Sequence, residues 1–226
     1  MKIKNFLIGL VMAASAFASA AASAATYVVD AKDDIFLAGQ TTVPDNTTGD
    51  IYTSLWGYNP DAPGAGAGLL PLKVAVSAGE YLTISASGAV SCCYGGSPTN
   101  GPDGGGLGGT AGVTPGFGYV DPVTSGAELA LLGIFDNGTS DYGTPFVVGS
   151  SYTIKVPADA TFLYLGVADA YGFDDPPGWY NDNTGSFDVT ISAAPEPATW
   201  AMMLIGFAGL GGALRMQRRR AVAATA

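Results

Sequence analysis

The sequence contains no histidine, and only 12% of its 226 residues are charged. Without histidine, catalysis by a Ser-His-Asp or Cys-His arrangement is excluded, as is a histidine-ligated zinc site. Nine Lys and Arg residues against 19 Asp and Glu residues give a net charge of -10. This charge opposes nucleic-acid binding, because neutralising phosphates requires clustered bases. The composition favours a binding module or a structural surface protein over an enzyme.

Cysteine is nearly absent, and the two cysteines, Cys92 and Cys93, are adjacent. An adjacent pair links no distant segments, so it does not form a disulfide framework. In an oxidising compartment the alternatives are a vicinal disulfide, two free thiols or an intermolecular link. Zinc binding by this pair alone is disfavoured, because a closed zinc site takes four ligands.

Residues 1–24 have the pattern of a secretory signal. Two lysines precede a short apolar run, and Ala22-Ser23-Ala24 forms an A-x-A cleavage site. Cleavage there starts the mature chain near Ala25, and a cut after Ala18-Ser19-Ala20 is the alternative. We therefore predict an N-terminal signal helix that is removed on export.

The last segment, residues 195–226, has three parts in order. Pro195-Glu196-Pro197 precedes fifteen uncharged residues over 200–214. Extended by two further uncharged residues, this run reaches the short end of a membrane-spanning helix at about 1.5 Å per residue. Trp200 lies where an interfacial aromatic belt is expected, and arginines after the run would hold that end in the cytoplasm. The cluster consists of Arg215, Arg218, Arg219 and Arg220.

This tail resembles the PEP-CTERM sorting signal of Gram-negative bacteria. The resemblance covers Pro195-Glu196-Pro197, the Ala198-Thr199-Trp200 that follows, the Gly-rich apolar run and the arginine cluster. It implies recognition by an exosortase, a membrane enzyme similar to cysteine transpeptidases, which processes the tail near Pro-Glu-Pro. The implied destination is the cell envelope, the outer surface or the extracellular space, often of organisms that make extracellular polysaccharide.

The segment between Ala25 and Ala194 is strongly acidic. Its three bases are Lys32, Lys73 and Lys155, and it holds 18 of the 19 acids, which gives a formal charge of 3 - 18 = -15. Such a charge favours divalent cations and repels nucleic acid and anionic lipid. Simple solubility of an exported protein is the alternative explanation.

Apolar residues in this segment alternate with period two, which predicts short strands. We expect an all-β fold, an antiparallel jelly-roll β-sandwich, because turns rich in Gly, Asn and Asp separate the strands. The Gly-rich stretch Gly95–Gly118 is predicted to be a long loop. The predicted strands are 72–76, 80–85, 128–135, 145–148, 151–156, 162–168 and 186–192, with 35–37 as an edge strand.

A loop of acids and amides is the best candidate site. Asp169 ends a predicted strand, and Asp182-Asn183 stands where the loop returns to the next strand. Calcium prefers six to eight hard oxygens from carboxylates, amides and backbone carbonyls, and these residues supply them. Glycines at 178 and 185 permit the tight backbone that this requires. The alternative is that these are ordinary turn-forming residues.

Two patches resemble the PA-I-type galactophilic lectins, small calcium-dependent jelly-roll sandwiches of pseudomonads. Residues 78–88 are similar to their second strand and its turn. Residues 162–169, followed by residues 180–187, are similar to their calcium loop. The likeness spans roughly Leu72 to Ser192 and is continuous only in these patches.

This resemblance implies a set of calcium ligands. Asp169 is the first carboxylate ligand, and Trp179 contributes its backbone carbonyl. Asp182 and Asn183 supply side-chain oxygens, and Cys92 is the closest match to the position that gives a further carbonyl.

The chain departs from the lectins in two respects. The loop after Asp169 is longer, which leaves Asp175 as a rival first ligand. The family holds galactose partly through a His and a Gln after the second strand, whereas this chain has no His and Gln40 is the one Gln before the tail. Calcium binding therefore transfers better than sugar specificity.

A sugar bound at the calcium would be gripped by Asp169 and Asp182 and would pack on aromatic rings, because the C–H faces of sugars pack on aromatics. The alternative is that two of the rings plug the end of the sandwich. The available rings are Tyr171, Phe173, Trp179 and Tyr180.

Three segments follow from these patterns: a signal peptide over 1–24, an exported domain over 25–194 and a sorting tail over 195–226. The favoured hypothesis is a cell-surface domain that binds calcium and, through it, a carbohydrate or polysaccharide. The alternative is a structural surface or biofilm-matrix protein in which calcium only stabilises the loop. A glycan hydrolase is disfavoured, and we expect no enzymatic activity.

Overall fold

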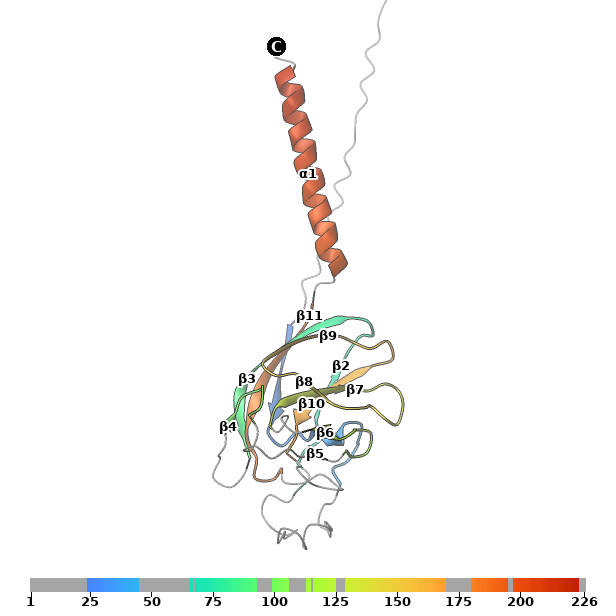
Figure 1. Cartoon of the computed structure of the whole chain (residues 1–226), viewed down its shortest axis with the longest axis vertical. Helices are drawn as coiled ribbons and strands as arrows, with labels where there is room; N and C mark the ends of the chain where they lie inside the picture. The colour runs from blue at the N-terminus through green and yellow to red at the C-terminus, as the bar shows by residue number, and fades with distance from the viewer. Residues whose placement is uncertain are drawn as a thin grey trace, which may run out of the picture.

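The computed structural model of the chain describes residues 24–44, 66, 68–92, 99–105, 113–114, 116–124, 129–169, 180–194 and 197–223. The predicted signal helix lies outside these ranges except for Ala24. The described residues form a body of β-strands from which one helix extends, as Figure 1 shows.

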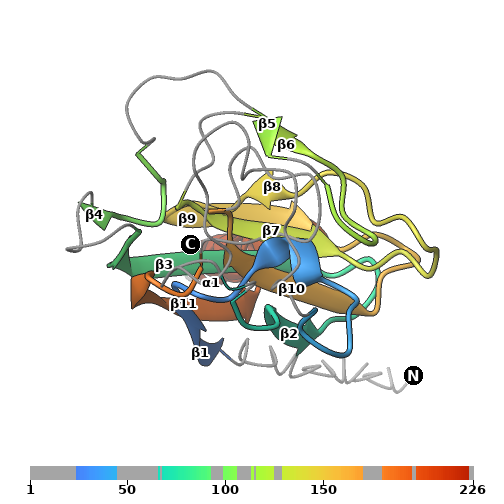
Figure 2. The same cartoon turned by 90° about the horizontal axis from the view of Figure 1, so that it is seen from below.

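Two antiparallel sheets make up most of the described body (Figures 1 and 2). The first has the strand order β1-β11-β3-β4, and β9 also pairs with β3. Its members are β1 (Ala24–Asp30), β3 (Tyr81–Ser91), β4 (Thr99–Asn100), β9 (Ser151–Lys155) and β11 (Thr184–Ala193). The second has the order β2-β10-β7-β8. Its members are β2 (Leu72–Ala75), β7 (Leu131–Phe135), β8 (Phe146–Val147) and β10 (Phe162–Val167). A short ribbon pairs β5 (Val113–Thr114) with β6 (Val123–Thr124).

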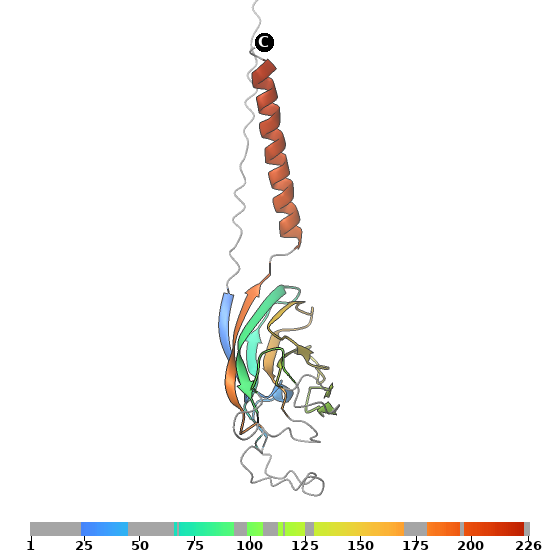
Figure 3. The same cartoon turned by 60° about the vertical axis from the view of Figure 1, so that its left-hand side comes forward.

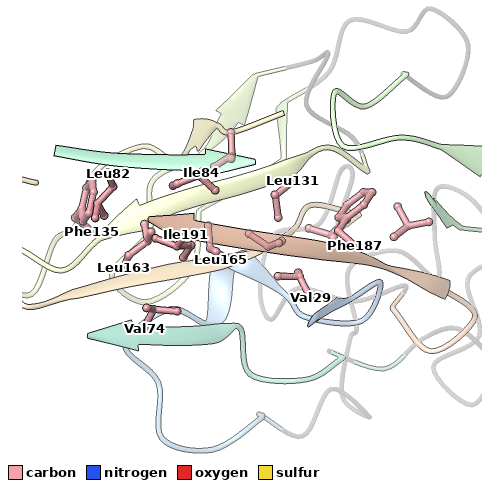
Figure 4. Close-up of a cluster of buried hydrophobic side chains, with 14 of the residues drawn as sticks. Val29, Val74, Leu82, Ile84, Leu131, Phe135, Leu163, Leu165, Phe187 and Ile191 are labelled. Atoms are coloured by element: carbon pink, nitrogen blue, oxygen red, sulfur yellow. The ribbon is translucent and has the colours of Figure 1, made fainter. Parts of the chain in front are cut away.

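The main hydrophobic core lies between the two sheets, which Figure 3 shows as separate layers. Alternate residues of each strand point inward, so each sheet contributes one face to this core (Figure 4). Burying a Leu, Ile or Phe side chain stabilises the fold by about 1.5–3 kcal/mol. The first sheet contributes Val29, Leu82, Ile84, Val90, Phe187, Val189 and Ile191. The second contributes Val74, Leu131, Phe135, Leu163, Leu165 and Val167.

The second sheet is also covered on its other face. A 3-10 helix, η1 (Ile35–Leu37), and the segment around Val120 pack there against Leu132 and Ile134 of β7 and Tyr164 of β10. All five residues of β7 and the last five of β10 are therefore buried. Burial on both faces accounts for the uninterrupted apolar sequence of these two strands.

The ladder between β3 and β11 leaves no room for a Cβ at two glycines. Gly88 lies opposite Phe187 and Gly185 opposite Val90, and both glycines have positive φ, 108° and 94°. A Cβ added to Gly88 would lie 2.5 Å from the carbonyl oxygen of Ser186, and one on Gly185 would meet the carbonyl oxygen of Ala89. Only glycine fits both the φ value and the contact.

Most predicted strands are present, with shifted ends. The prediction for 35–37 is wrong: these residues form η1, because the Asp34 side chain accepts a hydrogen bond from the Phe36 N–H at 2.8 Å and caps a helical turn. Sequence analysis did not predict β1, which pairs along its whole length with β11. Within the predicted loop Gly95–Gly118, the described residues include β4 and β5. The jelly-roll connectivity stays a prediction.

The predicted C-terminal helix is present as α1 (Pro197–Ala223). Leu204, Ile205 and Phe207 on it are each more than 60% exposed. The uncharged stretch ends at Arg215, well before the helix does. In the part of the chain that the structure describes, no helix is both long and apolar enough to span a bilayer, so the membrane-spanning part of the prediction is not confirmed.

The lack of room at Gly88 in the β3–β11 ladder predicts that adding a single methyl group there strongly destabilises the fold. Gly88→Ala should lower the free energy of unfolding by about 2–4 kcal/mol, because it combines an unfavourable φ with a clash against the Ser186 carbonyl. Gly79→Ala is the matched control: its φ is 78°, but nothing lies within 4 Å of its added Cβ. It should cost only about 1–2 kcal/mol. Urea unfolding measures both, and equal losses would contradict this account of the ladder.

Candidate functional site

Tyr180 joins the two ends of the loop between β10 and β11. Its side chain is fully buried. Its hydroxyl donates a hydrogen bond to the Val167 carbonyl at 2.9 Å and accepts one from the Asp169 N–H at 3.0 Å. The end of β10 is therefore fixed to the segment that leads into β11 by contacts within the protein.

Asn183 is the second buried polar side chain at this end of the sandwich, with 1% of its surface exposed. Its backbone N–H donates to the Tyr180 carbonyl at 3.2 Å, and its side-chain Nδ2 donates to the Ala31 carbonyl at 3.0 Å. The bond to Ala31 fixes the orientation of the amide, because a carbonyl cannot accept from the amide oxygen. The oxygen, Oδ1, is buried and has no hydrogen-bond partner among the described residues.

Asp34 brings a carboxyl group to the same place from the segment after β1. It is fully buried, and its Oδ1 accepts from the Phe36 N–H at 2.8 Å. Burial raises the pKa of Asp34 well above its ordinary value, against the effect of the hydrogen bond from the Phe36 N–H, and the charge of nearby Asp169 adds to the rise. Two carboxyl groups and a phenol thus lie together in a region that disfavours negative charge.

Asp33 lies against the end of β10. Its backbone carbonyl accepts from the Val167 N–H at 2.7 Å, and its Oδ2 accepts from the Asp30 N–H at 2.9 Å. Burial raises the pKa of Asp33 to about 6, the Asp30 backbone hydrogen bond lowers it, and the Asp30 charge raises it further. The electrostatics of this end of the sandwich therefore favour a cation, or protons, over unpaired carboxylates.

The structure brings together some of the predicted calcium ligands. Asp169 is 7% exposed and Asn183 is 1% exposed, and both contact Tyr180. Asp182 is half-buried, and its pKa is raised because burial outweighs a backbone hydrogen bond and the charge of Lys32.

Cys92 follows the last residue of β3, Ser91, whose ladder partner Thr184 follows Asn183. This register places Cys92 near the return of the loop, and its side chain is buried in the main core. The predicted ligand Trp179, the rival Asp175 and residue 93 lie outside the described residues.

The predicted sugar platform is corrected in part. Tyr180 has no exposed surface, so its ring offers no face to a sugar, and its hydroxyl holds the loop ends instead. Trp179, Tyr171 and Phe173 lie outside the described residues.

The donor set fits a hard cation to a limited extent. Asn183, whose backbone N–H is bonded to the Tyr180 carbonyl, carries an orphaned amide oxygen, and oxygens of this kind are what calcium prefers. Among the described residues, no group of three or more Asp, Glu, His or Cys side chains is arranged to hold a metal ion. Any complete site therefore depends on backbone carbonyls or on residues outside the described ranges.

Sequence analysis missed the contribution of Asp33 and Asp34. A signal was present, because two acids directly before the apolar Ile-Phe-Leu form a helix-capping pattern. Their burial against β10 is a tertiary contact that the local pattern does not reveal.

Comparison with known proteins identifies the tail. Residues 193–220 match the PEP-CTERM protein-sorting motif, which confirms the predicted sorting signal. No curated protein matches the chain. Among solved structures, it is similar to one described as "EclA N-terminal domain; PllA-like lectin", with a TM-score of 0.39 and 23% identity over 75% of this chain and 95% of the other. A TM-score at this level does not bear on the function.

Tyr180→Phe tests the contact that fixes the loop ends. The substitution keeps the ring and removes the hydroxyl, which leaves the Asp169 N–H and the Val167 carbonyl without this partner. We expect a loss of about 1–3 kcal/mol in the free energy of unfolding, measured in urea. Tyr152→Phe is the control, because Tyr152 is 37% exposed and should change stability by less than about 0.5 kcal/mol. A Tyr180→Phe protein as stable as the control would show that the hydroxyl does not hold the loop.

Proposed function

We propose that the chain is an exported surface protein that binds calcium at the end of its β-sandwich opposite the tail and, through the calcium, binds a carbohydrate. The PEP-CTERM motif implies export, membrane-anchored sorting and recognition by an exosortase-type enzyme. The single observation that carries the calcium proposal is the buried amide oxygen of Asn183, oriented by Ala31 and without a hydrogen-bond partner among the described residues.

A buried polar atom without a partner costs about 1–3 kcal/mol. A cation at Asn183 Oδ1 would remove that cost and would also offset the burial of Asp169. The residues that would hold calcium are Asp169, Asp182 and Asn183 through their side chains, with the backbone carbonyls of Trp179 and Cys92. When bound, calcium would supply a positive centre that coordinates a pair of sugar hydroxyls.

The position of these residues in the sandwich supports an outward-facing role. β11 begins at Thr184, directly after Asn183, and ends at Ala193, directly before the tail. A strand of ten residues spans about 30 Å, so the candidate site and the tail lie at opposite ends of the body. Figure 1 shows α1 leaving the body beside the end of β11. A domain tethered by its tail would present the site away from the tether.

The protein contributes an ordered frame for this binding. Tyr180 holds the backbone of Asp169, and Asn183 is held by Ala31. Such preorganisation reduces the entropy that a ligand must remove on binding. Asp169 and Asp182, with Trp179 beside them, would then complete the grip on a neutral sugar. We propose no catalytic step.

The burial of the Asn183 and Asp169 side chains favours a second function, in which calcium has a structural role only. With Asn183 1% and Asp169 7% exposed, the cation would be largely enclosed by protein. An enclosed calcium suits a structural role in a surface or matrix protein, in which it links the loop ends and no sugar binds.

Calcium binding is tested by thermal unfolding of the full chain in detergent, with excess calcium and then with excess chelator. Calcium at about 100 times its dissociation constant should raise the melting temperature by roughly 5–10 °C. Asp182→Ala should abolish this rise, because it removes a ligand. Asp188→Ala, an exposed acid of β11 on the outer face, should retain it.

No calcium-dependent rise in the unmodified chain would sink the calcium proposal. Where the rise occurs, a glycan array separates the two functions. Calcium-dependent glycan binding lost in Asp182→Ala supports the carbohydrate-binding function, whereas the absence of glycan binding supports the structural one.

A further inference from the structure

The chain contains two Asn-Gly pairs, Asn100–Gly101 and Asn137–Gly138, in different surroundings. Asparagine is a chemically labile residue, and before glycine its side chain is open to attack by the next backbone nitrogen, because glycine has no Cβ. Asn137 is half-buried in the loop after β7, and Gly138 is exposed. Asn100 lies in β4 and is 8% exposed. One dipeptide can therefore be compared in two environments of the same chain.

The loop after β7 holds both ends of the Asn137 amide. Its Oδ1 accepts a hydrogen bond from the Thr139 N–H at 3.1 Å and lies 2.7 Å from the Thr139 hydroxyl. Its Nδ2 donates to the Asp141 carbonyl at 2.6 Å. The Thr139 hydroxyl also lies 2.8 Å from that carbonyl, and its single proton is donated to one of the two acceptors at a time. The amide thus has two donors at its oxygen and an acceptor at its nitrogen.

The contacts at the amide oxygen become stronger when the amide carbon is attacked. Attack of the Gly138 nitrogen on the Asn137 Cγ places negative charge on Oδ1, where the two Thr139 donors already stand. No described residue accepts a hydrogen bond from the Gly138 N–H. Nothing lies within 4 Å of a Cβ added to Gly138, so the attacking residue is not crowded. The loop therefore provides the donor arrangement of an oxyanion hole for this reaction.

We propose that Asn137–Gly138 is a site of self-modification, at which the folded loop promotes conversion of Asn137 to aspartate and isoaspartate. The Gly138 nitrogen loses its proton and bonds to Cγ, the Cγ–Nδ2 bond breaks, and Nδ2 takes up a proton and leaves as ammonia. Water then opens the five-membered succinimide ring. Opening at Cγ gives aspartate, and opening at the backbone carbonyl carbon gives isoaspartate. The reaction needs only water and is independent of calcium and of the tail.

The modification changes how the loop is held on the second sheet. A carboxylate oxygen takes the place of Nδ2, the donor to the Asp141 carbonyl, so that two acceptors then face each other. The next residue, Tyr142, stacks on Tyr119 and on Tyr164, with ring centroids 5.1 Å and 6.0 Å apart. Conversion of Asn137 therefore adds a negative charge and removes a bond beside this row of rings.

The reaction is measured in the full chain, kept in detergent at mildly alkaline pH and digested at intervals for peptide mass spectrometry. In the folded chain, Asn137 should be converted at least about tenfold faster than Asn100, because Asn100 is buried and its backbone is paired with Val90. In chain unfolded by urea, the two rates should approach each other. Both aspartate and isoaspartate should appear at position 137, because both come from the ring.

Thr139→Val tests whether the folded loop promotes the attack. The substitution removes the hydroxyl donor and keeps the backbone N–H donor. We expect conversion of Asn137 in the folded chain to slow by at least about fivefold, with no change in urea. Thr139→Ser, which keeps a hydroxyl group at this position, is the matched control and should retain the natural rate.

A Thr139→Val chain that converts Asn137 as fast as the natural chain, or faster, would overturn the proposal, because the hydroxyl would then not promote the attack. Equal rates at Asn137 and Asn100 in the folded chain would also overturn it. So would an effect of Thr139→Val that persists in urea, since the folded loop would then not be its cause.

Discussion

The antiparallel ladder between β3 and β11 is the constraint on which the rest of the structure depends. It pairs ten residues, from Thr184 opposite Ser91 to Ala193 opposite Leu82. One face of it supplies Ile84, Phe187 and Val189 to the main core. Because β11 is both the last strand of the body and the strand that returns from the acid-rich loop, this ladder fixes the candidate site at one end and the tail at the other.

The two ends of β11 are held very differently. Just before its first residue, Thr184, the buried side chains of Tyr180 and Asn183 form hydrogen bonds within the protein. The buried carboxyl groups of Asp34 and Asp169 lie at the same end of the sandwich. At its last residues the side chains are small and half-buried. A rigid end suits a binding site, because its groups are ordered before the ligand arrives.

Patterns along the chain predicted the strands well where burial is continuous, as in β7 and β10, or alternates along the strand, as in β2 and β11. The prediction failed at 35–37, where three apolar residues in a row resemble an edge strand and the cap from Asp34 decides for a helical turn. It missed β1, which begins where the signal sequence was expected to end. Within the candidate site, the sequence pattern proposed Asp169 and Asn183, which both contact Tyr180, but the burial of Tyr180 and Asp34 depends on contacts between distant segments. No local pattern carries that information.

Hydrogen–deuterium exchange of single amides in the full chain, with chelator present, tests most directly the claim that the candidate site is rigid and that the tail end of β11 is held less firmly. The account predicts that the Asp169 amide, bonded to the Tyr180 hydroxyl, is protected as strongly as the centre of β10. It also predicts that the Ala194 amide, bonded to Tyr81, exchanges at least about a hundredfold faster. Rapid exchange at Asp169, or strong protection at Ala194, would contradict it.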